Sequence, residues 1–250
     1  RMIFVSLMDR DNANFQKTFQ QILKTLTAAA IPVQVPIGSG KNFKGIVNLL
    51  SMKAHLFKAG DKGNYEETEI PEELTSDVET FREQLIEAIV AADDELLEAF
   101  FEGEELDPKQ VLEVLGKAIW NGDVVPVFCG AGVNSWGVRT LLDKIDELMP
   151  SPIEVTPEIV KNRDGETEIR AESTSATAAL VFKTTSEPQV GDLSYFRIFG
   201  GRITNGLTLL NPQHSENERI AHLAIPQGAQ RLDVDSLSPG AVSYTHLRAH

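Results

Sequence analysis

Met2-Ile3-Phe4-Val5-Ser6-Leu7-Met8-Asp9-Arg10 is the stretch of sequence that decides the fold of this chain. Residues 2 to 7 form a short, nearly continuous apolar run rich in β-forming residues, which predicts a strand buried on both faces of a parallel sheet. Asp9 would then lie at the carboxyl end of that strand, where open α/β sheets bind their ligands. Apolar residues with helical spacing follow at Phe15, Phe19, Ile22, Leu23 and Leu26.

The carboxylate of Asp9 suits the recognition of a base, because it has two acceptor oxygens and no donor. Guanine offers a matching pair of donors, its ring N–H and its exocyclic amine. The alternative is that Asp9, together with Asp11 and Asn12, only caps the helix that follows. Both roles stay open on these residues alone.

The segment from Ile3 to Phe15 resembles the guanine-specificity segment of translational GTPases of the elongation factor G family, where Asn-Lys-x-Asp-Arg is followed by a similar Ala-Asn-Phe ending. Asp9 matches the family's aspartate, whereas Ser6 stands at its asparagine and Leu7 at its lysine. In the family the asparagine ties the loop to neighbouring backbone and the lysine lies over the base. The resemblance implies a guanine site lined by Asp9, Ser6 and Leu7, in which Ser6 fills part of the asparagine's role and Leu7 covers the base without charge.

A second segment, Phe128-Cys129-Gly130-Ala131-Gly132, resembles the family's other guanine contact, commonly Gly-Ser-Ala. In the family that contact comes from backbone N–H groups, so the resemblance implies that Ala131 and Gly132 donate to the base oxygen. The alternative from the residues alone is an ordinary glycine turn between a strand and a helix. The family pattern continues through Gly137-Val138, Leu141-Leu142-Asp143 and residues 148–152.

Composition places the chain among globular proteins, with 250 residues of which 42% are hydrophobic and 24% charged. No apolar run is long enough for a transmembrane helix and no signal peptide is visible, so we expect a cytoplasmic protein without a membrane partner. The single cysteine, Cys129, fits a reducing compartment and a buried structural thiol. A net charge of -14 argues against general nucleic-acid affinity, and we expect no DNA partner.

Acidic residues crowd between Glu66 and Asp107, where Arg82 is the only basic residue. Such a run usually forms a solvated helical face, and a docking surface for a partner is the alternative. Within it, a helix is predicted to begin near Ser76 with a Ser-x-x-Glu capping box to Glu79. Another is predicted between Asp107-Pro108 and Asn121-Gly122, because Asp, Pro and Gly stand where helix ends favour them.

About a hundred residues separate the first apolar run from the next buried strand, Val124 to Cys129, although one helix normally joins parallel strands. We therefore expect an incomplete α/β nucleotide-binding domain of the P-loop GTPase type over residues 1–150, carrying an α+β inserted subdomain at about 33–122. The elongation factor G family has an insert at this place, and Pro36-Ile37-Gly38 with residues 42–47 resembles its entry. In the family the insert helps to engage acidic stalk proteins of the large ribosomal subunit.

Residues 151–241 predict an incomplete all-β barrel, because short β-rich runs alternate there with Gly and Asn-Pro turns. Residues 179–184 and 191–198 resemble the second domain of the same factors, which faces ribosomal RNA of the small subunit. Arg197, Arg202 and Arg219 are candidate phosphate contacts, although isolated arginines on strands are more often simply solvated.

Residues 242–250 break the family pattern, and they match one reading frame of a common transposon-based sequencing adapter. We therefore expect this tail to be adapter read-through rather than part of the protein. A metal or RNA tail is the weaker alternative, because His246 and His250 have no third ligand nearby.

The family couples GTP hydrolysis, with Mg²⁺, to the movement of tRNA and mRNA on the ribosome. Its phosphate loop, switch segments and magnesium ligands have no counterpart in this chain, and Gly38-Ser39-Gly40-Lys41 lacks the first glycine and the final Ser or Thr of a phosphate loop. We therefore expect GTP or GDP as the family's ligand but neither a catalytic residue nor a metal site here. Alternative functions are a non-catalytic ribosome- or stalk-binding module, a ribosomal protection protein, or a paralogue without translocase activity.

Overall fold

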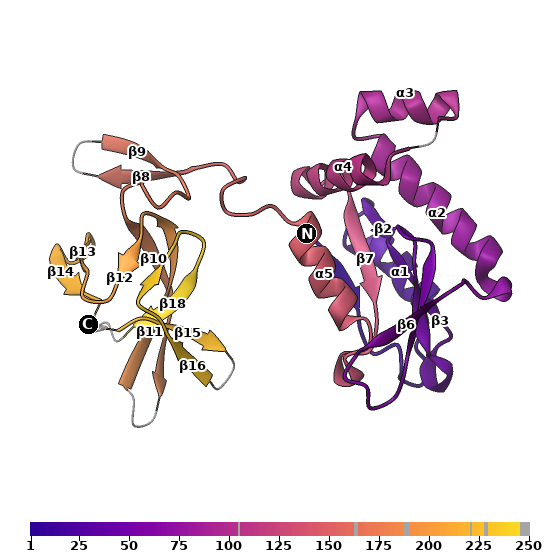
Figure 1. Ribbon diagram of the computed structural model, residues 1–250, viewed down its shortest axis with the longest axis horizontal. Helices are drawn as coiled ribbons and strands as arrows, with labels where there is room; N and C mark the ends of the chain where they lie inside the picture. The colour runs from indigo at the N-terminus through magenta and orange to yellow at the C-terminus, as the bar shows by residue number, and fades with distance from the viewer. Residues whose placement is uncertain (105, 163–164, 188–190, 221, 228–229, 246–250) are drawn as a thin grey trace. The chain divides into compact units, whose positions relative to one another are not determined.

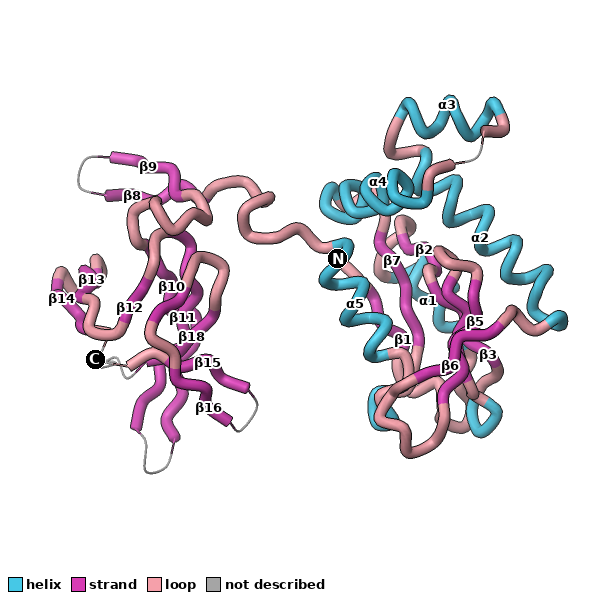
Figure 2. Tube along the Cα trace, in the orientation of Figure 1, coloured by secondary structure: helices cyan, strands magenta, loops and turns pink. Residues whose placement is uncertain are grey.

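A computed structural model describes residues 1–104, 106–162, 165–187, 191–220, 222–227 and 230–245. The chain divides into two compact units, unit 1 (Arg1–Met149) and unit 2 (Pro150–His250). Helices occur in unit 1, whereas the described part of unit 2 consists of strands and loops (Figure 2). Within the described ranges, no helix has both the length and the apolar character needed to cross a membrane.

A three-stranded parallel sheet organises unit 1, in the order β1 (Ile3–Val5), β7 (Val125–Cys129), β2 (Ala30–Pro32). Every residue of the central strand β7 is buried, as its apolar sequence predicts. The expectation for the first strand was wrong in one respect: β1 is half-buried, not buried on both faces. The cause is its place at the edge of the sheet, where β7 is its only neighbour among the described strands.

Helix α1 (Phe15–Thr25) follows β1 and confirms the helical spacing, since Phe15, Phe19 and Ile22 are its buried residues. Its N-cap is Asn14, whose side chain accepts a hydrogen bond from the Lys17 N–H at 2.8 Å. Asp9 therefore does not cap this helix, and its carboxylate is left for another role.

The inserted segment begins with a four-stranded antiparallel sheet in the order β3 (Gln34–Ile37), β4 (Gly45–Asn48), β5 (Lys53–Phe57), β6 (Tyr65–Thr68). A short 3-10 helix, η1 (Gly40–Asn42), lies between β3 and β4.

Four more helices complete unit 1. A 3-10 turn, η2 (Glu72–Leu74), leads directly into α2, so the helix begins before Ser76 and the predicted capping box is absent. The predicted helix after Asp107 is confirmed, with Asp107 as N-cap and Gly122 in the left-handed region at φ +90°. The four helices are α2 (Thr75–Val90), α3 (Asp94–Glu102), α4 (Pro108–Asn121) and α5 (Val138–Leu148). Figure 1 shows α3 beyond α2 and α4, away from the parallel sheet.

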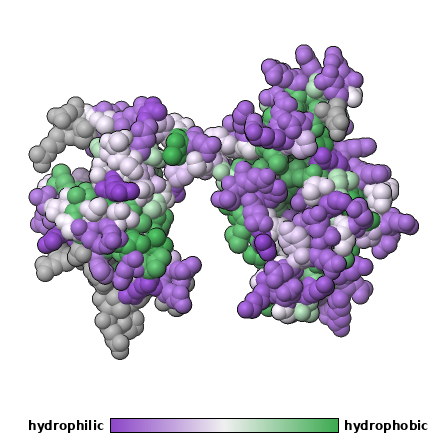
Figure 3. All heavy atoms as spheres, viewed as in Figure 1, coloured by the Kyte–Doolittle hydropathy of each residue, from purple (hydrophilic) through white to green (hydrophobic). Residues whose placement is uncertain are grey.

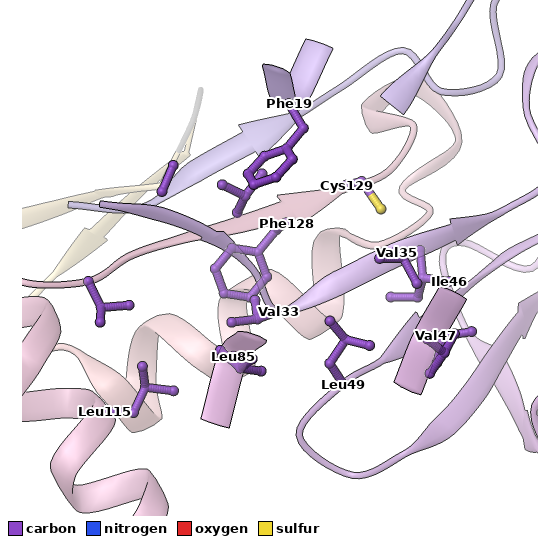
Figure 4. Packing of buried hydrophobic residues seen from close by; sticks show 14 of the residues in the cluster. Phe19, Val33, Val35, Ile46, Val47, Leu49, Leu85, Leu115, Phe128 and Cys129 are labelled. Atoms are coloured by element: carbon purple, nitrogen blue, oxygen red, sulfur yellow. The ribbon is translucent and has the colours of Figure 1, made fainter. Parts of the chain in front are cut away.

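The inserted segment and the parallel sheet share one hydrophobic core (Figure 4). Phe128 and Cys129 of β7 belong to the same buried cluster as Val33, Leu85 and Leu115. Because the insert contributes so much of this core, we expect unit 1 to fold as one body. Burial raises the pKa of the Cys129 thiol, so this side chain stays neutral as a structural thiol should.

Unit 2 is mostly antiparallel β structure, as predicted. Its largest sheet is open, in the order β10-β11-β18-β15-β16, and no sheet of the described residues closes on itself. The expected barrel is therefore not seen as a closed sheet; the β10–β11 pairing contains register shifts, and the other strands form short separate pairs. The strands are β8 (Glu158–Asn162), β9 (Gly165–Ile169), β10 (Ala178–Glu187), β11 (Gly191–Gly200), β12 (Ile203–Thr204), β13 (Thr208–Asn211), β14 (Glu216–Arg219), β15 (Ala224–Gln227), β16 (Gln230–Asp233), β17 (Ser236–Leu237) and β18 (Val242–Thr245).

The first part of the unusual C-terminal segment lies inside the sheet of unit 2. Residues 242–245 form β18, which pairs with both β11 and β15, and Tyr244 is buried. His246 and His250 lie outside the described residues. The adapter origin of residues 242–250 stays a prediction.

Candidate functional site

Two loops meet at the carboxyl ends of β1 and β7. The first runs from Ser6 to Asn12 and the second from Gly130 to Gly137. They are joined by backbone hydrogen bonds from Gly130 N–H to the Val5 carbonyl and from Met8 N–H to the Gly130 carbonyl, each 3.0 Å long. The two strands are parallel neighbours, so this junction follows directly from the order of the sheet.

Asp9 lies at this junction with one oxygen paired and the other free. Its Oδ2 accepts a hydrogen bond from Asn134 Nδ2 at 3.0 Å. Its Oδ1 is buried and has no hydrogen-bond partner among the described residues. A buried acceptor left unpaired costs about 1–3 kcal/mol, so this oxygen favours a ligand that brings a donor.

Leu7 has a left-handed backbone conformation, with φ at +62°. Such a φ is uncommon for a bulky residue that is not glycine. The turn around it is closed by a hydrogen bond from Arg10 N–H to the Leu7 carbonyl at 3.0 Å. The Leu7 side chain is 51% exposed, so an apolar surface stands open beside Asp9.

Ser6 faces the second loop. Its Oγ lies 3.6 Å from the point where a Cβ atom on Gly132 would stand. The structure therefore brings Ser6, Leu7 and Asp9 of the first loop to the predicted glycine turn of the second.

The two predicted backbone donors of the second loop differ in their availability. The Ala131 N–H donates to the Trp136 carbonyl at 2.9 Å, and the Ala131 carbonyl accepts from Trp136 N–H at 3.1 Å. The Gly132 N–H has no acceptor among the described residues, although its carbonyl accepts from Ser135 N–H. Gly132 is therefore the better placed of the two to donate to a ligand.

Gly130 is required by close packing rather than by an unusual φ. A Cβ atom there would stand 2.2 Å from the Trp136 carbonyl oxygen and 2.9 Å from a ring atom of Phe4. No side chain fits this space, so the glycine keeps the two loops in contact.

Sequence reasoning missed two residues of the site, Asn134 and Trp136. Asn134 ends the 3-10 turn η3 (Gly132–Asn134) and reaches Asp9, and a polar residue in a turn flanked by glycines was the available signal. Trp136 packs against the insert, with its ring 5.7 Å from that of Phe57 at an angle of 11°, and 5.9 Å from that of Phe43. Nothing in the local sequence reveals these contacts, because they come from distant strands.

The segment Gly38 to Lys41 is hydrogen-bonded to the loop that carries Asp9. Gly40 N–H donates to the Met8 carbonyl at 2.9 Å, so its backbone is used within the protein. Lys41 is exposed. Within the part of the chain that the structure describes, there is neither a phosphate-loop cradle here nor any group of three His, Cys, Asp or Glu residues placed to hold a metal ion.

The remaining candidates lie elsewhere. A hollow of about 550 Å³ is lined mainly by alanines of the α1–β2 loop and the end of α2, with Asp123, and it therefore lies at the amino ends of β2 and β7, away from Asp9. In unit 2, Arg197, Arg202 and Arg219 are all exposed. Arg197 lies over the ring of Phe199, with its Cζ 5.8 Å from the centroid.

The chain is similar in sequence to elongation factor G of Thermotoga maritima, with 37% identity over 247 residues, and to that of Thermotoga neapolitana, with 36%. Each match covers 97% of this chain and 35% of the relative, so the chain spans about a third of the length of these proteins. A crystal structure of a protein from Thermus thermophilus superposes with a TM-score of 0.80 at 27% identity, over 100% of this chain and 34% of that one. No protein-family model matches. The chain is thus a homologue of elongation factor G, corresponding in length to about a third of the proteins of that name.

Proposed function

We propose that unit 1 recognises guanine and is part of the nucleotide domain of a translational GTPase of the elongation factor G type. The observation that carries this proposal is the free Oδ1 of Asp9 at the junction with Gly132. A guanine base has donors for a carboxylate and a carbonyl oxygen for a backbone N–H, and the two loops offer these partners side by side. Leu7 supplies an apolar cover for the base in place of a charged one.

The whole protein would bind GTP or GDP with Mg²⁺ in the cytoplasm and act on the ribosome, as the family does. Phosphoryl transfer depends on a phosphate cradle, a metal ion and a positioned water. The described residues of this chain form neither a phosphate cradle nor a group of three metal-ligating side chains, so we propose that the chain itself reads the base without hydrolysing GTP. Turnover of GTP by the purified chain above background, lost in an Asp9→Ala variant, would contradict this.

Base recognition can be tested by exchanging the chemistry of Asp9. Purified chain is titrated with GMP, AMP and XMP while amide resonances are followed by NMR. We expect millimolar-range binding of GMP in preference to AMP, abolished by Asp9→Ala. Asp9→Asn should move the preference from GMP to XMP, because xanthine carries a carbonyl where guanine has its amine, and the asparagine amide can donate to it. Equal binding of all three bases would refute guanine recognition.

Unit 2 is proposed to correspond to the family's second domain and to contact ribosomal RNA of the small subunit. On the β10–β11 pair a cation lies beside an aromatic ring, since Lys183 Nζ lies 5.7 Å from the centroid of Tyr195. Such a pair suits contact with phosphates and stacked bases. Binding of the chain to small ribosomal subunits, measured by co-sedimentation, should fall for Lys183→Ala and stay unchanged for Lys161→Ala, a cation on β8.

The insert is proposed to contact stalk proteins of the large subunit, as the insert of the family does. Hydrophilic residues cover most of the face of unit 1 seen in Figure 3. Phe101 of α3 is 78% exposed. Aromatic residues are enriched at protein–protein interfaces, so Phe101 is the candidate anchor of this contact. A contact with stalk proteins would also serve the alternative function, a ribosome-binding module that uses no nucleotide. The titration above would favour that alternative if no base bound.

A further inference from the structure

The free oxygen of Asp9 owes its orientation to a side chain of the other loop. We propose that Asn134 is a positioning residue of the guanine site, which holds the Asp9 carboxylate so that Oδ1 is presented to the base. This inference rests on the proposed guanine binding and adds the residue that sets its selectivity.

The chemistry of the contact fixes its direction. Asn134 Nδ2 lies 3.0 Å from Asp9 Oδ2. A carboxylate can only accept hydrogen bonds, so the amide must present its nitrogen to Asp9 rather than its oxygen. The amide is neutral, so the negative charge of Asp9 remains available to the donors of the base.

The backbone under Asn134 is held firmly enough for such a role. Asn134 N–H donates to the Ala131 carbonyl at 3.2 Å, and Ala131 is paired in both directions with Trp136. The next residue, Ser135, adopts φ of +59° and closes the turn through a hydrogen bond to the Gly132 carbonyl. The Asn134 side chain therefore starts from a fixed point on the same turn that carries the free Gly132 N–H.

Without this amide, the Asp9 carboxylate would turn more freely, because the terminal torsion of an aspartate has a broad energy minimum. Guanine and hypoxanthine differ only in the exocyclic amine, so the orientation of the carboxylate decides how well it separates them. A contact made before the ligand arrives reduces the ordering cost of binding. Asn134 is therefore expected to matter most for the discrimination between these two bases.

The test compares GMP with IMP, which lacks the exocyclic amine, by NMR titration of the full chain. Wild type should prefer GMP. Asn134→Ala should lower GMP affinity about threefold to tenfold and bring the GMP-to-IMP ratio towards one. Asn134→Asp should weaken GMP binding further, because a second carboxylate repels Asp9 and cannot donate. Val133→Ala is the matched control, since that neighbouring side chain is 78% exposed and should change neither value.

The outcomes distinguish a failure of this inference from a failure of the proposed guanine binding on which it rests. If wild type discriminates and Asn134→Ala keeps the full ratio, or binds GMP more tightly, the positioning role is wrong while guanine recognition stands. If wild type binds GMP, IMP and AMP alike, both are wrong. The amide spectrum of each variant reports whether its fold is intact, so that loss of structure is not mistaken for loss of selectivity.

Discussion

At the residue scale, Gly130 at the loop junction has no room for a side chain. Gly130→Ala should destabilise unit 1 by more than about 2 kcal/mol, because the added methyl group overlaps the Trp136 carbonyl and the Phe4 ring. Gly116→Ala is the matched control: its Cβ would meet only the Leu148 carbonyl at 3.6 Å, an ordinary contact. This helical substitution should stabilise by about 0.5–1 kcal/mol. Urea denaturation measures both, and equal effects would contradict this expectation.

His55 should make unit 1 less stable in mild acid. The side chain is 3% exposed and stacks on Tyr65 at 4.0 Å, and burial lowers its pKa despite Glu67, whose Oε2 lies 3.6 Å from Nε2. Lys144 also lowers this pKa. In the unfolded chain the pKa is about 6.5, so below that pH the unfolded state binds the proton first and the free energy of unfolding falls.

The measurement is the urea midpoint at several pH values from about 7.5 down to about 5, a range that spans the ordinary histidine pKa. The wild-type midpoint should fall through this range more steeply than that of His55→Gln, which cannot take up the proton. Parallel curves for the two proteins would show that His55 does not cause the dependence.

At the scale of elements, some residues cap a helix with a hydrogen bond, whereas others only match a capping motif in the sequence. Asn14→Ala should cost about 1 kcal/mol, because the N-cap hydrogen bond to Lys17 N–H is lost. Ser76→Ala should change stability by less than about 0.5 kcal/mol, since Ser76 lies inside α2 and caps nothing. Thermal denaturation followed by circular dichroism compares the two variants, and a larger loss for Ser76→Ala would be incompatible with the observed helix start.

The helix starts near Asn14 and Ser76 also show which features of the fold could be predicted from the sequence. Periodicity located α1, α4 and β7, because each carries its own apolar pattern and end signals. The helix near Ser76 was predicted too, but its capping box is absent because the 3-10 turn η2 leads directly into α2. No signal of this kind marks β5 and β6, because β5 is defined by pairing with β4, and β6 by pairing with β5.

The site divides in the same way. The positions of Asp9 and Gly132 at the carboxyl ends of two strands could be predicted from their segments, whereas their role in binding guanine stays a proposal. The contact between Asn134 and Asp9 spans 125 positions and depends on the folded turn, so no local pattern contains it. The hydrogen bond from the Ala131 N–H to the Trp136 carbonyl could not be predicted for the same reason.

At the scale of the whole molecule, each unit has its own hydrophobic core. Leu115 belongs to the core of unit 1 and Phe196 to a separate cluster in unit 2. Leu115→Ala and Phe196→Ala should each cost about 3–5 kcal/mol, and each should lower one of two transitions in differential scanning calorimetry. If either variant shifts both transitions equally, the units do not unfold separately.

Trp136 belongs to the second loop of the proposed guanine site and stacks on Phe57 of the insert, which gives the protein an optical sensor of its own. The chain has two tryptophans. The other one, Trp120, lies on α4 and is 52% exposed, and it belongs to neither loop of the site. With Trp120 changed to Phe, the remaining emission would come from a ring that contacts the insert and whose backbone is hydrogen-bonded to Ala131 of the second loop. Its fluorescence would therefore report, without any attached dye, whether an event on the insert reaches the turn that we propose reads the base.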